Sequence, residues 1–341
     1  MFNVIYFIFY KLIIYMKYEK YTNYVVTLII LMGFGALYNR YKEKFDVDDD
    51  KKQNDMIKKY LLQDDSLAIV KKPLLWIHVE HVPNARFWDS FSSRTTDNFN
   101  QPYQFLTIKS IVDKCSKSFN IVFVDDDSFS RIIPEWKHNM SILPDPIKSY
   151  FRELAMSKLL YLYGGIIVPA STICIKNLEE IYYRNTANKG MFIGEFYNRT
   201  ITNQSGGVNF FPHTRFMGCE RENESMKELI NYIELVISQD NSNEINLDGK
   251  LSRKCFELIK SGKVKRITTD LLGGVDANNK IISIEDLMGN TFFNLPETCS
   301  LVYIPADEIL KRTSYQWFAR LSTTQVIDSN TMIGKLLLLN A

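Results

Sequence analysis

The segment from residue 146 to residue 168 constrains the fold more than any other part of the chain. Residues 146–163 carry apolar side chains at helical spacing, and Pro146 suits the first turn of a helix. Gly164 and Gly165 end this helix, and residues 166–168 continue as a short run of β-branched side chains. A helix that leads directly into a buried strand is typical of α/β domains.

Further strand and helix patterns alternate along residues 71–341, which we therefore interpret as one domain. Strands are expected at residues 73–79, 119–124, 166–168, 190–194 and 207–211, and helices within 85–115 (broken at Pro102) and at 145–163, 225–238 and 250–261. This order predicts an α/β fold in which a mainly parallel, Rossmann-like sheet is flanked by helices. The sequence contains no phosphate-binding glycine loop of the GxGxxG or GxxxxGKS type.

The first seventy residues form three segments of different character. Residues 1–20 are an apolar and basic segment, and residues 21–38 contain no charged side chain. The second run is close to the length of about 20 residues that a membrane-spanning helix needs, so we expect a transmembrane anchor there rather than a buried core helix. Residues 39–70 are dense in both charges and are interpreted as a stem.

The expected location is a membrane with a single N-terminal anchor. Lysine and arginine lie on both sides of residues 21–38, so the positive-inside rule leaves the orientation open. Sequons at Asn139, Asn198, Asn203 and Asn223 are compatible with a lumenal domain, which is the expected side for an active enzyme of the class described below.

Charge and cysteine content exclude two functional classes. The formal net charge is +2, which gives no electrostatic basis for binding nucleic acid. The five cysteines are scattered without a CxxC pair, and there are only four histidines, so a structural zinc site is not expected.

The sequence from Leu160 to Ile167 resembles the core of glycosyltransferases with a DXD sugar-binding region. These are the family 32 and capsular polysaccharide synthesis types, whose pattern is Leu-Tyr-x-Tyr-Gly-Gly-x-Tyr followed by Asp-x-Asp. The similarity covers about residues 73–182, and degenerate sequences of the same kind occur in large DNA viruses. It implies a GT-A fold, a nucleotide-sugar donor, and a glycan or glycoprotein acceptor. It also implies donor contacts at His78, Asp125, Asp126, Gly164, Gly165 and Ser171.

The chain departs from that family where the family binds its metal. Pro169, Ala170 and Ser171 replace Asp-x-Asp, and these side chains are poor ligands for Mn²⁺ or Mg²⁺. In the preceding helix, Glu153 occupies the family's acidic position and Met156 its basic one. Metal-dependent transfer at the usual site is therefore not expected.

A second acidic cluster follows the strand at residues 119–124. Asp125 and Asp127 could share a divalent cation, Asp126 could contact the nucleotide, or the three could form a solvated turn. The catalytic candidates are Asp125, Asp127, Arg152 and Glu153. Two functions remain open: a membrane-anchored glycosyltransferase, and an inactive GT-A scaffold with a binding or structural role, for example in a virion.

Overall fold

The computed structural model describes residues 72–79, 101–197, 210–239 and 244–340. The three predicted N-terminal segments, 1–20, 21–38 and 39–70, lie outside the described residues. Within the described part, no helix combines the length and the apolar character required to cross a membrane.

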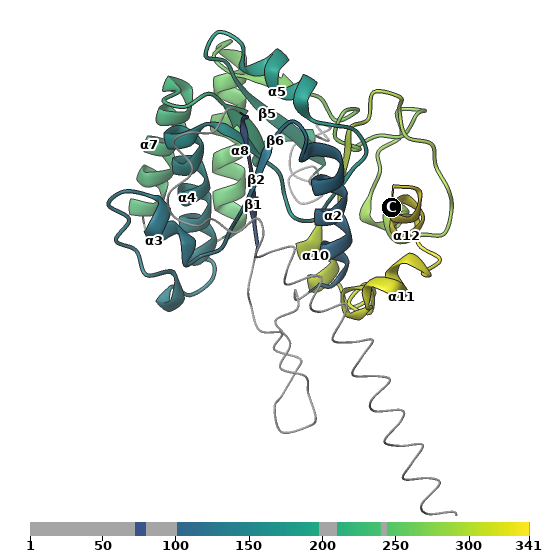
Figure 1. The fold of residues 1–341 in the computed structure, drawn as a ribbon. Helices are drawn as coiled ribbons and strands as arrows, with labels where there is room; N and C mark the ends of the chain where they lie inside the picture. Colours follow the sequence, from purple (N-terminus) through teal and green to yellow (C-terminus); the bar gives the residue numbers. More distant parts are fainter. Residues whose placement is uncertain (1–71, 80–100, 198–209, 240–243, 341) are drawn as a thin grey trace, which may run out of the picture. The chain divides into compact units, whose positions relative to one another are not determined.

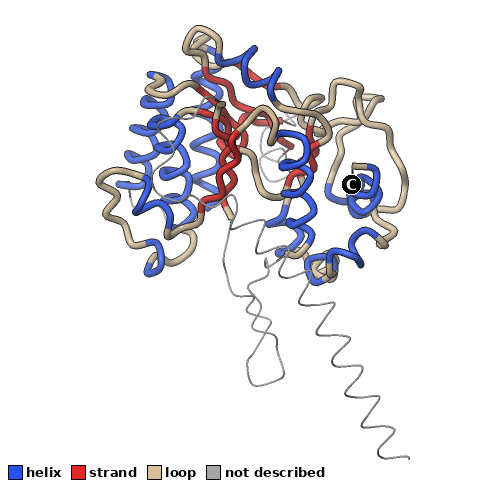
Figure 2. The backbone as a smooth tube through the Cα atoms, in the orientation of Figure 1, coloured by secondary structure: helices blue, strands red, loops and turns tan. Residues whose placement is uncertain are grey.

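A six-stranded sheet forms the centre of the domain (Figures 1 and 2). Its strand order is β2-β1-β3-β6-β5-β7. The pairs β1–β2, β1–β3 and β5–β7 are parallel, whereas β6 is antiparallel to both of its neighbours. Five strands therefore run in one direction and β6 runs in the other. The bounds are β1 Leu74–His78, β2 Asn120–Val124, β3 Gly165–Ile167, β5 Met191–Tyr197, β6 Phe210–Cys219 and β7 Lys265–Ile267.

The structure confirms the predicted α/β class and the mainly parallel, helix-flanked sheet. One strand differs from its prediction. The sequence predicts a strand at residues 207–211, of which residues 207–209 lie outside the described residues, and β6 covers Phe210–Cys219 and so extends well past residue 211. Pro212 lies within it and removes a ladder donor. The strand continues through it, and the register between β5 and β6 shifts between Ile193 and Gly194.

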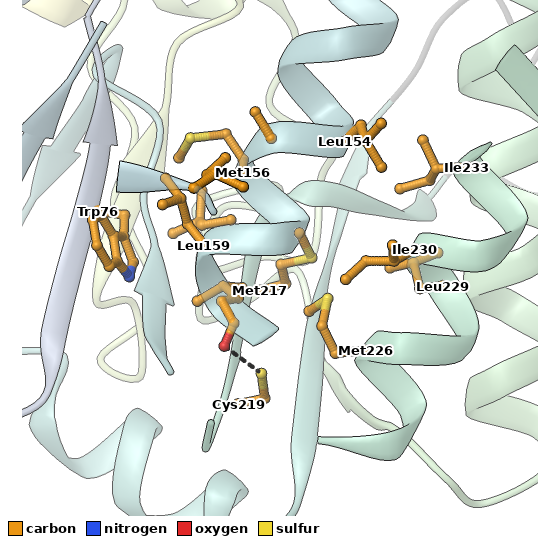
Figure 3. Packing of buried hydrophobic residues seen from close by; sticks show 14 of the residues in the cluster. Trp76, Leu154, Met156, Leu159, Met217, Cys219, Met226, Leu229, Ile230 and Ile233 are labelled. Atoms are coloured by element: carbon orange, nitrogen blue, oxygen red, sulfur yellow. Dashed lines mark hydrogen bonds between the residues drawn. The ribbon is translucent and has the colours of Figure 1, made fainter. Parts of the chain in front are cut away.

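One face of the sheet is covered by α4 (Ile147–Tyr163), α7 (Glu224–Ser238) and α8 (Glu244–Lys260). Alternate strand residues face these helices, because side chains alternate across a strand. Figure 3 shows Trp76 and Met217 from the sheet beside Leu154, Met156 and Leu159 of α4. The predicted helices 145–163 and 225–238 are thus confirmed, while α8 begins before the expected residue 250.

A second hydrophobic core joins α2 (Tyr103–Cys115) to the C-terminal part of the chain. A two-stranded antiparallel sheet of β4 (Thr172–Cys174) and β8 (Leu301–Tyr303) contributes to it. The remaining helices are α3 Ser128–Ile132, α5 Glu179–Thr186, α9 Ile284–Met288, α10 Ala306–Lys311, α11 Thr323–Ile327 and α12 Met332–Leu339, with 3₁₀ turns at Met140–Ile142 and Phe318–Arg320.

The Gly164–Gly165 pair is required by the backbone at the start of β3. Gly164 has φ +72° and Gly165 has φ +106°, values that side chains rarely tolerate. A Cβ on Gly165 would lie 2.2 Å from the carbonyl oxygen of Leu74 in β1. The Gly164 carbonyl also accepts a 2.9 Å hydrogen bond from Trp76 Nε1. These contacts fix the end of α4 against the first strand.

Asn223 caps α7, and its replacement should measurably destabilise the domain. Its side-chain oxygen accepts hydrogen bonds from the backbone N–H groups of Ser225 and Met226, at 2.9 and 3.0 Å. Its Nδ2 donates to the carbonyl oxygen of Lys189 at 2.7 Å. We expect Asn223→Ala to lower the free energy of unfolding by about 1–2 kcal/mol in urea titrations. The exposed cap Asn139→Ala is the control, and an equal loss there would contradict this interpretation.

Candidate functional site

Polar side chains gather at one edge of the sheet, where β1, β2, β3 and β5 end and β6 begins. In open α/β sheets, ligands bind beyond the carboxyl ends of the parallel strands. His78 closes β1, Asp125–Asp127 follow β2, Pro169–Ser171 follow β3, and His213–Arg215 lie near the start of β6. This edge is the candidate site.

Asp126 connects the ends of β1 and β2 to α4. Arg152 donates two hydrogen bonds to it, from Nε to Oδ1 at 2.8 Å and from Nη2 to Oδ2 at 2.7 Å. His78 Nε2 lies 3.0 Å from the same Oδ1, and its ring stacks on Phe129. Burial raises the pKa of Asp126, but the hydrogen bonds and charges of His78 and Arg152 outweigh it and hold this pKa well below its usual range. The structure therefore brings three predicted site residues into one ion-paired cluster.

The other two aspartates do not form an evident cation site. Asp125 Oδ1 accepts a 2.8 Å hydrogen bond from the backbone N–H of Ser128 and also contacts the Ser128 hydroxyl, so it closes the turn that leads into α3. Asp127 is exposed. Within the described residues, no group of three or more His, Cys, Asp or Glu side chains could hold a metal ion. Asp125 is thus engaged in the turn before α3, and a divalent cation shared by Asp125 and Asp127 stays a prediction.

The residues that replace Asp-x-Asp are held by α2. Ser171 Oγ donates to the carbonyl oxygen of Ile304 at 2.6 Å and lies 2.8 Å from the Tyr103 hydroxyl. Thr107 Oγ1 donates to the carbonyl oxygen of Ala170 at 2.6 Å. The Ser171 hydroxyl is buried and engaged within the protein, so the structure places it in the packing rather than in an open donor site.

Two predicted donor contacts lie away from this edge. Gly164 and Gly165 start β3, so they lie at its amino end, opposite to His78 and Asp126. Their close packing explains why glycine is needed there, and the expectation of a donor contact is not supported by their position. Lys158, another candidate cation of α4, pairs with Glu234 of α7 at 2.8 Å. Asn84, Arg86, Trp88 and Asp89, further sequence candidates for lining a donor pocket, lie outside the described residues.

A second buried polar cluster at this edge was not predicted from the sequence. Thr214 Oγ1 donates to Glu153 Oε2 at 2.6 Å, so α4 contacts both clusters through its consecutive residues Arg152 and Glu153. Arg215 Nη1 donates to the Tyr303 hydroxyl at 2.6 Å, and its guanidinium carbon lies 4.9 Å from the centre of the Tyr303 ring. The signal in the sequence was the polar triplet His213–Arg215 between apolar runs. The strand predicted at residues 207–211 ended before this triplet and therefore did not include it.

Charges within this second cluster balance one another. His213 Nε2 lies 3.5 Å from Asp248 Oδ1, and His213 Nδ1 accepts a hydrogen bond from the backbone N–H of Arg215. Burial raises the pKa of Asp248, but His213 and Arg215 together lower it. Burial lowers the pKa of Arg215, whereas Tyr303, Asp248 and other acidic groups raise it. Burial raises the pKa of Tyr303 to about 12. Arg215 is therefore charged and Tyr303 is neutral near pH 7.

A cavity adjoins this cluster at the carboxyl end of β5. Phe196 and Tyr303, the two rings that contact Arg215, also line the cavity. Its other polar walls come from α9, α10 and β5, and include Glu195, Glu285, Glu308 and Arg312. Burial raises the pKa of Glu195. The volume of the cavity is about 40 Å³, well below the several hundred Å³ of a typical small-molecule site, so it is a small cleft beside the cluster.

Comparisons with known proteins give little beyond the fold class. No protein-family pattern matches the chain, and no curated protein sequence matches it. Among solved structures, the chain is similar to the PaToxG glycosyltransferase, with a TM-score of 0.31 and 10% sequence identity. That superposition covers 56% of this chain and 70% of the other. A superposition this loose assigns neither a family nor an activity to this chain.

Proposed function

We propose that residues 71–341 form a glycosyltransferase-like domain that binds a nucleotide-sugar at the carboxyl edge of the sheet. The sugar would pass to a glycan or glycoprotein acceptor, and residues 21–38 would anchor the domain in a membrane. The observation that carries the proposal is that Arg152 and Glu153 of α4, adjacent in the sequence, bond to two different polar clusters at this edge. Both clusters lie where α/β sheets bind ligands.

The two clusters suggest a division of roles. The first, with His78 and Asp126, lies at the ends of β1 and β2, where the resemblance places the nucleotide. The second lies beside the cavity that Phe196 and Tyr303 line. We assign the acceptor or the donor sugar to the sheet edge beside this cluster, because sugars bind to planar polar groups and aromatic rings. Glu153 is a candidate catalytic or positioning carboxylate between the two clusters.

Charge compensation at the donor diphosphate is assigned to protein cations. No step of the proposal depends on a divalent cation. Arg152 and Arg215 are the guanidinium groups at this edge. Fixed cations can stabilise a leaving diphosphate when they are held in place by surrounding groups.

The alternative is an inactive GT-A-like scaffold with a binding or structural role, in a virion for example. One observation favours it: the Ser171 hydroxyl is consumed by packing bonds to Tyr103 and Ile304. A scaffold that had lost its chemistry would tolerate this replacement. The two functions differ in whether a nucleotide-sugar binds and turns over.

Binding of nucleotide-sugars to the full chain tests the proposal. A panel of UDP- and GDP-sugars is titrated by calorimetry with Mn²⁺ and with EDTA. We expect one donor to bind in both buffers and Arg215→Gln to weaken it at least about tenfold, because a charged hydrogen bond is lost. The matched control Arg221→Gln changes an exposed arginine that follows β6, at the opposite end of that strand from Arg215, and should leave binding intact.

Two further results decide between the hypotheses. The double variant Asp125→Ala/Asp127→Ala should leave donor binding unchanged in both buffers. If this variant loses donor binding only in the Mn²⁺ buffer, the predicted metal site at Asp125 and Asp127 is supported. If no donor binds in either buffer while the melting temperature is normal, the glycosyltransferase proposal is wrong and the scaffold remains. Turnover is then measured as release of the nucleoside diphosphate from the donor that binds.

A further inference from the structure

Helix α2 holds the segment 169–174 along most of its length. Tyr103 contacts Ser171, Thr107 donates to the Ala170 carbonyl oxygen, and the Ser110 hydroxyl accepts from the backbone N–H of Cys174 at 2.9 Å. At the last residue of the helix, the Sγ atoms of Cys115 and Cys174 lie 3.8 Å apart. Both side chains are fully buried. The row of contacts thus ends in two thiols that touch.

We propose that Cys115 and Cys174 are an oxidisable dithiol whose disulfide locks α2 to β4 and fixes the segment that replaces Asp-x-Asp. A disulfide joins sulfurs about 2 Å apart, so the two sulfurs must approach by roughly 2 Å. They lie on elements already packed together, and rotation about the side-chain bonds supplies part of such an approach. The proposal stands independently of the donor that the domain binds.

The chemistry requires a small-molecule disulfide such as oxidised glutathione. The Cys115 thiol loses its proton, and the thiolate attacks the glutathione disulfide, releasing one glutathione thiolate. The Cys174 thiolate then attacks the mixed disulfide and releases the second. Two protein thiols are oxidised and one small disulfide is reduced to two thiols. The hydrogen bond from Cys174 lowers the pKa of Cys115, which makes Cys115 the better first nucleophile.

The other cysteines form an internal control. Cys219, Cys255 and Cys299 are buried, and burial raises the pKa of each thiol to about 12. They lie on β6, on α8 and before β8. Among the described residues, Cys115–Cys174 is the one sulfur pair within contact distance.

Thiol counting on the full chain tests the proposal. The reduced protein is refolded in a glutathione redox buffer, quenched in acid, unfolded and alkylated. We expect three of the five cysteines to be alkylated, and peptide mapping to join Cys115 to Cys174. Oxidation should raise the melting temperature by on the order of 5 °C, and a reductant should reverse the rise.

Two serine variants complete the test. Cys115→Ser should give four alkylated cysteines and no redox-dependent shift in melting temperature, whereas Cys219→Ser should keep both the link and the shift. Five alkylated thiols in the oxidised wild type, a link to any other cysteine, or glutathione retained on Cys115 without a link would overturn the proposal. The wild-type peptide map decides the matter even if a variant does not fold.

Discussion

Gly165→Ala should prevent stable folding of the domain or lower its free energy of unfolding by at least about 3 kcal/mol. The added Cβ would lie 2.2 Å from the Leu74 carbonyl oxygen, a distance that side chains do not adopt. To relieve this clash, β1 and β3 would have to move apart where they pair in the central sheet. Circular dichroism and urea titration of the full chain measure the loss.

Gly262→Ala is the matched control. Gly262 also has a positive φ, +75°, but nothing lies within 4 Å of the position of its Cβ. It should therefore cost only about 1 kcal/mol, the strain of an alanine in the left-handed region. Equal losses in the two variants would show that backbone strain, and not the approach to β1, makes Gly165 necessary. If the Gly165→Ala protein is stable but does not bind a donor, Gly165 contributes to the donor site.

The sequence predicted those helices and strands whose structure depends mainly on their own residues. The helix at residues 145–163, its Gly-Gly end and the strands around residues 75 and 121 were predicted, because apolar spacing and glycine both act locally. The reversed direction of β6 was not predicted. Strand direction depends on which partner a strand meets, and β6 inserts between β3 and β5, both of which precede it in the sequence.

The candidate site was predicted only in part for the same reason. His78, Asp126, Arg152 and Glu153 follow strands or lie on the helix that the sequence singled out. Arg215 and Tyr303 do not, because the hydrogen bond between them joins residues that are 88 positions apart. Gly164 and Gly165 stand out in the sequence because the backbone packs tightly around them. The donor contact that the resemblance implies for them stays a prediction.

Asp126→Asn should lower the free energy of unfolding by about 2–3 kcal/mol at pH 7. The substitution keeps the shape of the side chain but removes the charge that faces Arg152, whose side chain is 17% exposed. Removing the charge of one partner abolishes the attraction of a largely buried ion pair while the other charge stays partly desolvated. Asp127→Asn, at the exposed neighbouring position, should change stability by less than about 0.5 kcal/mol.

The pH dependence separates this ion pair from simple packing. The pKa of Asp126 is depressed in the folded protein, so its contribution is fully present above the ordinary aspartate pKa of about 4. The contribution is lost as the pH falls toward the depressed value, because the unfolded chain then binds a proton that the folded chain excludes. Wild type and Asp126→Asn should therefore differ in stability by a constant amount between pH 5 and pH 7 and converge below about pH 4. A difference that stayed constant down to the acid transition would mean that the loss comes from hydrogen bonds that the amide cannot accept and not from the ionised carboxylate. The ion-paired cluster would then not be the element that joins β1, β2 and α4 at the candidate site.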